Sequence, residues 1–251
     1  MIFMVHGACG YMGTEMIKQI RHHFPDAEIV PVDSCQTCAD VYHAPSEYRG
    51  RVDCIVDFSH HSATKKLTDY AVAVQAPLVI ATTGQTPEER TMIACAAQSI
   101  PVFFTSNFSI GVAVLLRIAK EAVKAFPDAD IEIVEAHHNH KVDVPSGTAL
   151  TLAKAIQSVR ENAELNIGRH ENGKREKNEI GIHSLRMGNI AGVHEIHICT
   201  PTQTLTLKHE AHDRALFAEG AIEAIKFLIG QPAGLYDMEK MYTIKEENDD
   251  G

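Results

Sequence analysis

The sequence predicts an α/β protein in which a doubly wound parallel sheet is followed by a second, α+β domain built on an open mixed sheet. The first observation is the alternation of short apolar runs with stretches of helical spacing over residues 1–108. The second is a turn with three glycines directly after the first apolar run. The third is a group of β-like runs between residues 180 and 209 with no helical stretch between them. Alternating strands and helices predict a parallel sheet covered by helices, whereas consecutive strands predict an antiparallel or mixed sheet.

The first domain begins with an apolar run at residues 2–5, the glycine turn, and a helix on which Met16, Ile17, Ile20 and Phe24 recur at helical spacing. The remaining elements repeat this pattern of strands and helices. Strands are predicted at residues 28–33, 54–58, 78–81 and 102–104, and helices at 63–74 and 87–98. This order is typical of a Rossmann-like domain, which we expect to end near residue 108.

The second domain is expected at residues 109–213. A polar, glycine-broken stretch at 162–179 is interpreted as a long exposed loop. Helices are predicted at 112–126 and 148–159, and strands at 131–134, 180–185, 193–199 and 204–209. A last helix at 215–229 is expected to return to the first domain, so that residues 1–108 and 214–251 form one unit.

Composition and charge argue against a membrane protein and against a nucleic-acid-binding protein. Hydrophobic residues make up 45% of the 251 positions and charged residues 22%, and no apolar run approaches the roughly 20 residues that cross a bilayer. The first residues carry no basic leader, so we expect a cytoplasmic protein with no membrane partner. A net charge of -10 argues against nucleic acid as a partner, and an anionic ligand would have to be attracted by local basic groups such as Lys141.

The six cysteines form no paired framework, which predicts free thiols in a protein of this size and compartment. Cys35 and Cys38 form a C-x-x-C pair. A structural zinc site would need two further ligands at matching spacing, and none lies nearby in the sequence. The pair is therefore interpreted as two loop thiols.

The glycine turn has the spacing G-x-x-G-x-x-G, with glycines at Gly7, Gly10 and Gly13. Directly after a first strand, Gly7 would make the sharp turn and Gly10 would let the backbone approach a pyrophosphate. Gly13 would allow the helix to pack closely on the strand. The turn therefore predicts a dinucleotide-binding site.

Asp33 lies 20 residues after Gly13, at the end of the second predicted strand. An acid at this place can accept hydrogen bonds from both hydroxyls of an adenosine ribose, and its charge repels a 2'-phosphate. Because the neighbouring Ser34 is neutral, we expect NADH to be the preferred cofactor. NADPH stays possible if Arg49 or Arg51 folds over the pocket.

Residues 135–149, with the sequence E-A-H-H-N-H-K-V-D-V-P-S-G-T-A, combine imidazoles, an ammonium group and a candidate anion-binding turn. Histidine exchanges protons near neutral pH, and Lys141 can hold a negative charge. Ser146, Gly147 and Thr148 precede an Ala- and Leu-rich run, which is typical of the exposed N–H groups at a helix start. The segment therefore predicts an active site for a small anionic substrate.

Two other functions remain open on the sequence. His137 and His138 could ligate zinc in a hydrolytic enzyme, since the spacing of His137 and His140 places imidazoles near one another. Against this, no distant carboxylate or cysteine pair completes a ligand set, and Lys141 would repel a dication. A dinucleotide-binding regulator without turnover is the second alternative, which the intact His137, Lys141 and Ser-Gly-Thr set disfavours. Metal analysis tests the first alternative, and NADH oxidation tests the second. Isolated histidines are interpreted as surface or hydrogen-bonded core groups: His22, His60 and His194.

Several segments together resemble one family. The glycine turn, residues 81–84, residues 107–111 and above all residues 135–149 are similar to those of 4-hydroxy-tetrahydrodipicolinate reductase, formerly called dihydrodipicolinate reductase. Residues 181–186 and 234–238 resemble the later segments of the family, so the resemblance spans nearly the whole chain.

The resemblance implies an oxidoreductase of lysine biosynthesis through the diaminopimelate pathway. Its reaction is the reduction of dihydrodipicolinate, derived from 4-hydroxy-tetrahydrodipicolinate, to tetrahydrodipicolinate by hydride transfer from NAD(P)H. The resemblance also implies a homotetramer, with an N-terminal dinucleotide-binding domain and a C-terminal substrate-binding and oligomerisation domain.

Roles for individual residues follow from the same resemblance. The pyrophosphate would lie against Gly7, Ala8, Cys9, Gly10, Tyr11 and Met12, and the adenosine ribose against Asp33. The nicotinamide side would be lined by Ala81, Thr82, Thr83, Thr105, Ser106, Asn107 and Phe108. His137 would be the catalytic proton donor and Lys141 its charged partner, and the small dicarboxylate substrate would bind His138, Gly147 and Thr148, with no metal. Hydride would enter the conjugated C=C-C=N system of the substrate, and a group that titrates near the working pH would then protonate the enamine carbon.

Two positions depart from the family pattern. Ala81 stands where glycine is usual, which would strain a backbone with positive φ, but not a site where the carbonyl group alone is used. We therefore expect little change from this alanine. Ser34 stands where many members carry a basic residue, which weakens any expectation of dual cofactor use.

Overall fold

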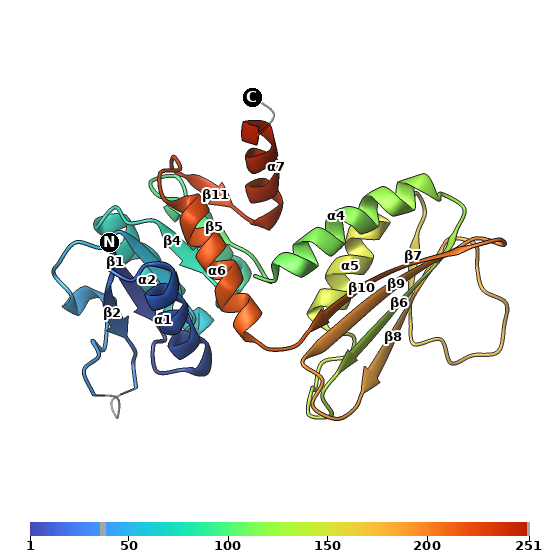
Figure 1. The fold of residues 1–251 in the computed structure, drawn as a ribbon, viewed down its shortest axis with the longest axis horizontal. Helices are drawn as coiled ribbons and strands as arrows, with labels where there is room; N and C mark the ends of the chain where they lie inside the picture. Colours follow the sequence, from blue (N-terminus) through green and yellow to red (C-terminus); the bar gives the residue numbers. More distant parts are fainter. Residues whose placement is uncertain (36–38, 250–251) are drawn as a thin grey trace. The chain divides into compact units, whose positions relative to one another are not determined.

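The computed structural model describes residues 1–35 and 39–249 of the chain. The chain divides into two compact units, one formed by Met1–Ser109 with Ala215–Gly251 and the other by Ile110–Arg214 (Figure 1). The chain thus leaves the first unit once and returns to it once.

The first unit contains a six-stranded sheet with the order β11-β5-β4-β3-β1-β2, in which every neighbouring pair is parallel. Strand β2 lies on one side of β1, and β3, β4 and β5 follow on the other side, so the strand order reverses between β1 and β3. Ligands of such sheets bind outside the carboxyl ends of the strands at this reversal. The strands are β1 (Ile2–His6), β2 (Glu28–Val32), β3 (Cys54–Asp57), β4 (Leu78–Ile80), β5 (Pro101–Phe104) and β11 (Gly234–Tyr236).

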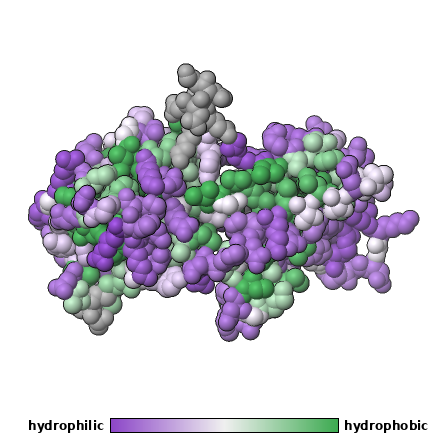
Figure 2. Space-filling view, in the orientation of Figure 1, coloured by the Kyte–Doolittle hydropathy of each residue, from purple (hydrophilic) through white to green (hydrophobic). Residues whose placement is uncertain are grey.

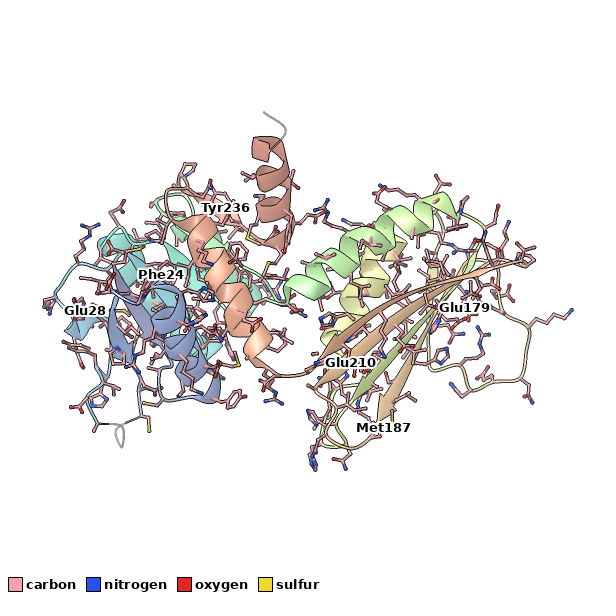
Figure 3. The ribbon with its side chains drawn as sticks, viewed as in Figure 1. Phe24, Glu28, Glu179, Met187, Glu210 and Tyr236 are labelled. Carbon is pink, nitrogen blue, oxygen red and sulfur yellow. The ribbon has the colours of Figure 1, made fainter. Side chains whose placement is uncertain are left out.

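Four helices of the first unit pack in two pairs, α1 beside α6 and α2 beside α3, and α7 contacts α6. Helix α3 begins with a capping box, in which the Thr86 hydroxyl accepts the N–H of Glu89 and the Glu89 carboxylate accepts the N–H of Thr86. At the end of α1, the ring of Phe24 packs on that of Phe3 in β1 with centroids 4.9 Å apart (Figure 3). The helices are α1 (Tyr11–His23), α2 (Thr64–Ala73), α3 (Pro87–Ala96), α6 (Ala215–Leu228) and α7 (Met238–Asp249), with 3-10 turns at Pro45–Glu47 and His61–Ala63.

The second unit is a five-stranded mixed sheet with the order β10-β9-β6-β8-β7. Strand β9 runs antiparallel to both β10 and β6, whereas β6, β8 and β7 are parallel to one another. In Figure 3, Glu179 marks the first residue of β8, and Met187 is the residue directly after its end. The elements are α4 (Ile110–Ala125), β6 (Asp130–His137), α5 (Gly147–Gln157), β7 (Glu164–Ile167), β8 (Glu179–Arg186), β9 (Gly192–Cys199) and β10 (Thr204–Ala211).

The core of the second unit lies between the sheet and the helices α4 and α5. Alternate residues of β6, β8 and β9 point to this side, and their isoleucines are buried with Leu152 and Ile156 of α5. The other alternate positions carry polar residues, among them Glu132 and His183. Apolar side chains also gather on the outer surface along α4, where Val114 is exposed (Figure 2).

The predicted fold class is confirmed: a Rossmann-like parallel sheet and a second unit with a mixed sheet. The interpretation of residues 162–179 as one loop is wrong in part, because Glu164–Ile167 form β7. This edge strand is only four residues long and lies within a polar, glycine-broken stretch, so its conformation depends on its pairing with β8. Strand β11 was not predicted, since its three residues gain their conformation from pairing with β5. Within the described residues, no helix is long and apolar enough to cross a membrane.

Candidate active site

The glycine turn joins β1 to α1 at the carboxyl edge of the parallel sheet. Gly7 has a φ of 82°, and a Cβ atom there would lie 2.6 Å from the carbonyl oxygen of Phe58. A Cβ atom on Gly13 would collide with the carbonyl oxygen of Gly7, so only glycine lets α1 pack this closely. Gly10 is the N-cap of α1, and no side chain of the described residues caps this helix. A helix start that offers only backbone N–H groups suits the pyrophosphate of a dinucleotide, because these groups can donate hydrogen bonds to phosphate oxygens.

Asp33 follows β2 and contacts the glycine turn. Its Oδ2 atom accepts the backbone N–H of Cys9 and its Oδ1 atom accepts that of Cys35, both at 2.9 Å. The carboxylate is thereby placed next to the backbone that fits a pyrophosphate, where an adenosine ribose would follow. Arg51, one of the two basic residues considered for a 2'-phosphate, lies 2.6 Å from Asp53.

The loops after β3, β4 and β5 reach the same edge of the sheet. His6 and Asp57 form a buried pair with Nδ1 and Oδ1 2.9 Å apart, and the Ser59 hydroxyl donates to the same oxygen at 2.5 Å. The N–H of Ala81 donates to the carbonyl oxygen of Asp57, and Ala81 does not have a positive φ, so the alanine is not strained. The loops after β4 and β5 contain the remaining predicted cofactor residues: Thr82, Thr83, Thr105, Ser106, Asn107 and Phe108.

In the second unit, candidate residues gather at the C-terminal end of β6. The period of two along the strand puts Ile133, Glu135 and His137 on one face, so two ionisable side chains continue the apolar row of the core. Glu135 is 0% exposed and His137 is 8% exposed. The Nδ1 atom of His137 lies 2.5 Å from Oε2 of Glu135. Because Nδ1 is occupied, Nε2 is the nitrogen with which His137 can exchange a proton.

Glu135 accepts hydrogen bonds from two further elements. Arg186, the last residue of β8, donates to Oε2 at 2.9 Å and to Oε1 at 2.7 Å. The backbone N–H of Ser146, the N-cap of α5, donates to Oε1 at 3.1 Å. Burial by itself raises the pKa of Glu135, but the hydrogen bonds from His137 and Arg186 hold this pKa well below its ordinary value. Glu135 is therefore an ionised carboxylate inside the protein.

His194 lies on β9 directly opposite Glu135. Its Nε2 atom is 3.1 Å from the hydroxyl oxygen of Ser146, and its ring meets that of His137 edge to face with centroids 5.2 Å apart. Burial, and then the charge of His137, lower the pKa of His194 to about 4. His194 is thus a neutral, hydrogen-bonded core group, in agreement with its interpretation from the sequence.

The loop after β6 carries the other basic side chains of the segment. The Nζ atom of Lys141 lies 2.7 Å from Oδ1 of Asp143. Burial, and then the positive charge of Arg214, lower the pKa of His138. The loop thus offers an ammonium group and a neutral imidazole close together in sequence.

Helix α5 begins at Gly147. The hydroxyl of Ser146 accepts the N–H of Ala149 at 3.2 Å and caps the helix. A Cβ atom on Gly147 would meet none of the described atoms within 4 Å, so the first turn is open to an incoming group. The open start of α5 can attract a carboxylate, and Lys141, six residues earlier in the chain, adds a positive charge.

Sequence reasoning placed His137, His138, Lys141, Gly147 and Thr148 on one segment, and they occupy the end of β6, the following loop and the start of α5. It assigned no role to the partners that surround His137. A signal was present, because a glutamate at an inward position of an alternating strand needs buried partners. Sequence reasoning missed the roles of Glu135 and Arg186. It predicted Ser146 at the helix start and His194 as a hydrogen-bonded core group, but it did not connect either residue with His137.

The prediction of free thiols is wrong at Cys9, which is disulfide-bonded. Disulfides depend on proximity in the fold, which cysteine spacing alone did not indicate. Cys38 of the predicted C-x-x-C pair lies outside the described residues. In the part of the chain that the structure describes, no three His, Cys, Asp or Glu side chains are arranged to hold a metal ion. Among the described residues, the cysteines that form no disulfide are Cys35, Cys54, Cys95 and Cys199.

Comparison with known proteins gives matches over nearly the whole chain. Residues 1–108 match the family model described as dihydrodipicolinate reductase, N-terminus, and residues 111–242 match the one described as dihydrodipicolinate reductase, C-terminus. A 4-hydroxy-tetrahydrodipicolinate reductase of Caldanaerobacter subterraneus subsp. tengcongensis is 42% identical over 95% of this chain and 96% of its own. That of Clostridium tetani is 41% identical over 95% of each chain.

A solved structure has a similar fold. It is a dipicolinate-bound dihydrodipicolinate reductase from Paenisporosarcina sp. TG-14, with a TM-score of 0.80 and 24% identity. The similarity covers 94% of this chain and 97% of that one, so it extends over both units.

Proposed function

The chain belongs to the dihydrodipicolinate reductase family, and we propose that it reduces dihydrodipicolinate, derived from 4-hydroxy-tetrahydrodipicolinate, to tetrahydrodipicolinate with NAD(P)H. This is the reductase step of lysine biosynthesis through the diaminopimelate pathway. The observation that carries the proposal is the segment in which the proton-exchanging His137, the ammonium group of Lys141 and the open start of α5 follow one another. This segment offers a proton and two anion-binding groups to a small dicarboxylate.

The first unit would hold the cofactor. When bound, NAD(P)H supplies a hydride from C4 of its nicotinamide ring. Asp33 would accept hydrogen bonds from the adenosine ribose and repel a 2'-phosphate, which supports a preference for NADH. The pyrophosphate would contact Gly7, Ala8, Cys9, Gly10, Tyr11 and Met12, and the nicotinamide side would be lined by Ala81, Thr82, Thr83, Thr105, Ser106, Asn107 and Phe108.

The second unit would bind the substrate. Lys141 would leave Asp143 for a substrate carboxylate, since both are anions that compete for the same ammonium group. Gly147 and Thr148 would bind a carboxylate at the start of α5, where the helix dipole favours negative charge. His138 would contact the substrate from the loop between them.

His137 would deliver the proton. Reduction at the conjugated C=C-C=N system leaves an enamine whose carbon must be protonated. In its doubly protonated form, His137 holds a proton at Nε2 that it can donate to this carbon. The positive charge of Lys141, four residues later in the chain, would assist this proton transfer. The imidazole regains its proton from solvent after the product leaves.

A homotetramer assembled through the second unit is part of the proposal. Its support is the resemblance to the family, which implies that the second unit is an oligomerisation domain. Sedimentation equilibrium would measure the assembly. A mass of one or two chains at micromolar concentration would contradict this part of the proposal without affecting the activity.

The deciding experiment is oxidation of NADH at 340 nm with freshly made aldolase product as substrate. Steady turnover is expected, with kcat/KM higher for NADH than for NADPH. Lys141→Ala should raise the substrate KM and lower kcat, while the KM for NADH stays unchanged. No turnover with either cofactor would refute the proposed function, and a clear NADPH advantage would refute the role of Asp33 alone.

A further inference from the structure

Glu135 is the most completely enclosed ionised group of the candidate site, and it contacts two different functional elements. One oxygen faces His137 and the other faces the start of α5, while Arg186 donates to both. We propose that Glu135 is a positioning residue that fixes the His137 ring with its proton on Nδ1 and its Nε2 free for the substrate, and that joins the proton donor to the substrate-binding turn. The inference deepens the proposed function and rests on His137 as the proton donor.

The tautomer follows from the charge of Glu135. A carboxylate without a proton can accept hydrogen bonds but cannot donate one. Arg186 also donates only, so its two bonds to the carboxylate favour the ionised form. At 2.5 Å from Oε2, the Nδ1 atom of His137 must therefore be the donor, and the neutral ring has its lone pair on Nε2. Every proton that His137 exchanges then passes through Nε2.

The ring is also fixed in its plane. His194 packs edge to face against it from β9. On the same strand, a Cβ atom at Gly192 would lie 3.2 Å from Nε2 of His137, closer than an ordinary contact. Glycine therefore leaves the space next to the reacting nitrogen open, while Glu135 prevents rotation of the ring by holding Nδ1.

The second oxygen of Glu135 extends this arrangement to the substrate. It accepts the N–H of Ser146 at 3.1 Å, and Ser146 caps the helix whose first residues would bind a carboxylate. Ser146 is further tied to His194 by its hydroxyl. One buried carboxylate thus sets the distance between the proton donor and the anion-binding turn, both of which must meet the same small molecule.

The first measurement uses the wild-type protein with 15N-labelled histidine and no ligand. The imidazole nitrogen shifts report which nitrogen carries the proton, and His137→Gln identifies the signals of His137. Above the pH at which the ring becomes neutral, we expect the proton on Nδ1. A neutral ring protonated on Nε2 would overturn the proposal, and this result depends neither on turnover nor on a substitution of Glu135.

The second measurement compares Glu135→Gln with Glu132→Gln, a matched change on the same strand. The amide of Glu135→Gln keeps an oxygen for Ser146 but presents N–H groups that can donate to Nδ1, so the proton of His137 should move to Nε2. We expect kcat to fall about 100-fold, within the ~10²–10⁴-fold that general acid catalysis supplies, with a smaller change in substrate KM and none in the KM for NADH. Glu132→Gln should leave kcat and the His137 signals unchanged.

Three results would overturn the role of Glu135, and a fourth would refute the proposed function instead. Unchanged kcat in folded Glu135→Gln would overturn the proposal, and so would an unchanged His137 tautomer. Equal losses in both variants would also overturn it, because they would indicate a general effect of charge on β6. Failure of the wild-type protein to reduce the substrate would refute the proposed function instead, while the tautomer of the free protein would still test the role of Glu135.

Discussion

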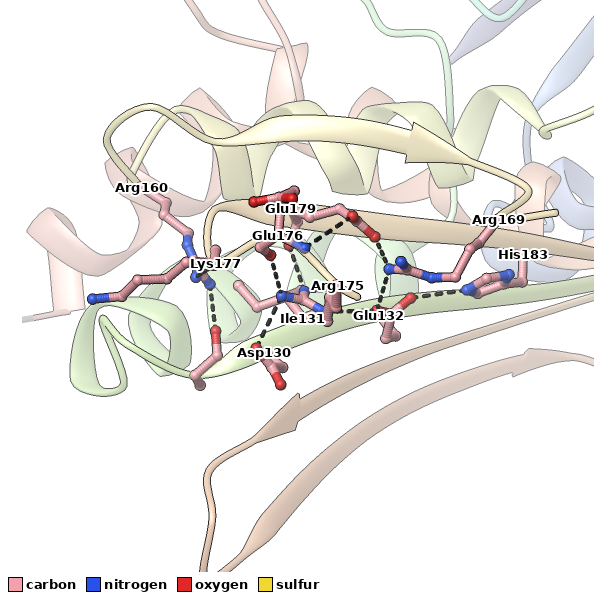
Figure 4. Close-up of polar contacts among 11 residues, drawn as sticks. Asp130, Ile131, Glu132, Arg160, Arg169, Arg175, Glu176, Lys177, Glu179 and His183 are labelled. Carbon is pink, nitrogen blue, oxygen red and sulfur yellow. Dashed lines mark hydrogen bonds and ion pairs between the residues drawn. The ribbon is translucent and has the colours of Figure 1, made fainter. Parts of the chain in front are cut away.

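Strand β6 carries two glutamates three residues apart, and each is paired with one histidine and one or more arginines. Glu135 contacts His137 and Arg186 on the core side of the sheet. Glu132 contacts His183 at 2.8 Å and Arg175 at 3.0 Å on the other face (Figure 4). The side chain of Glu135 is 0% exposed, whereas that of Glu132 is 28% exposed. The same residue types therefore occur in two settings that differ mainly in access to water.

The setting decides what each cluster can do. Water screens the charges around Glu132, so its ion pairs contribute little to the free energy of unfolding. The residues of these pairs can therefore exchange partners. Arg175 in fact donates to several oxygens, including the backbone carbonyl groups of Ile131 and Glu179, and so fastens the chain between β7 and β8. Around Glu135, by contrast, the charge cannot be screened, and the fixed donors impose one tautomer and one orientation. A buried carboxylate can therefore prepare a histidine for chemistry, and an exposed one stabilises a loop.

The largest expected effect separates the two histidines. His137→Gln should lower kcat by about 10²–10⁴-fold with little change in the KM for NADH, because general acid catalysis is lost. His183→Gln, at the Glu132 cluster, should change kcat less than about twofold. The NADH assay at saturating substrate measures both. Near-normal turnover of His137→Gln would remove this residue from the mechanism and break the comparison.

The next effect is on stability and separates the two arginines. Arg186→Leu leaves the buried charge of Glu135 short of a partner, which should cost about 3–5 kcal/mol of the free energy of unfolding. Arg175→Leu, at a partly exposed cluster, should cost about 1 kcal/mol. Urea unfolding followed by circular dichroism at neutral pH gives both values. Equal costs would show that burial does not distinguish the clusters.

A smaller effect depends on pH and concerns His194. Its pKa is about 4 in the folded protein, against about 6.5 in an unfolded chain, so below pH 6.5 the unfolded chain gains a proton that the folded protein does not. The contribution of this neutral ring to the free energy of unfolding is fully present above pH 6.5, and it is lost as the pH falls toward 4. Between pH 7 and pH 5 the loss should be about 2 kcal/mol.

His194→Asn should remove this part of the pH dependence. Ser146→Ala is the control, because it removes the hydrogen bond to Nε2 but leaves the ring buried. It should lower stability by about 1 kcal/mol at both pH values through loss of the helix cap. Urea unfolding of all three proteins at pH 7 and pH 5 provides the data. If His194→Asn shows the same difference in stability between pH 7 and pH 5 as the wild-type protein, another group causes this pH dependence.

The smallest expected effect concerns salt. A double-mutant cycle between Glu132 and Arg175 should give a coupling of about 0.2–1 kcal/mol that declines toward zero at ~1 M salt. The cycle between Glu135 and Arg186 should give a larger coupling that changes less with salt, since the carboxylate of Glu135 is fully buried although the side chain of Arg186 is 17% exposed. Parallel salt responses in the two cycles would contradict the difference in burial.

Much of the fold could be predicted because its signals are local. The three glycines, the strand before them and Asp33 after the next strand indicate a dinucleotide fold by spacing alone, and the alternation of strands and helices indicates the parallel sheet. Ser146 and Gly147 indicate the start of a helix, because the signal depends only on neighbouring residues. Strands β7 and β11 escaped prediction because their conformation depends on partners elsewhere in the chain.

By itself, then, the sequence determined the order of most elements, the family, and the residues whose type suits the chemistry, because strand and helix periods and motif spacings are properties of neighbouring residues. The tertiary structure alone decided that Arg186, 51 positions after Glu135, donates to its carboxylate. It also placed His194 opposite Glu135 through the register of β9 on β6. Register and burial are set by pairing across the sheet, and they turned one of two similar glutamates on β6 into the buried partner of His137.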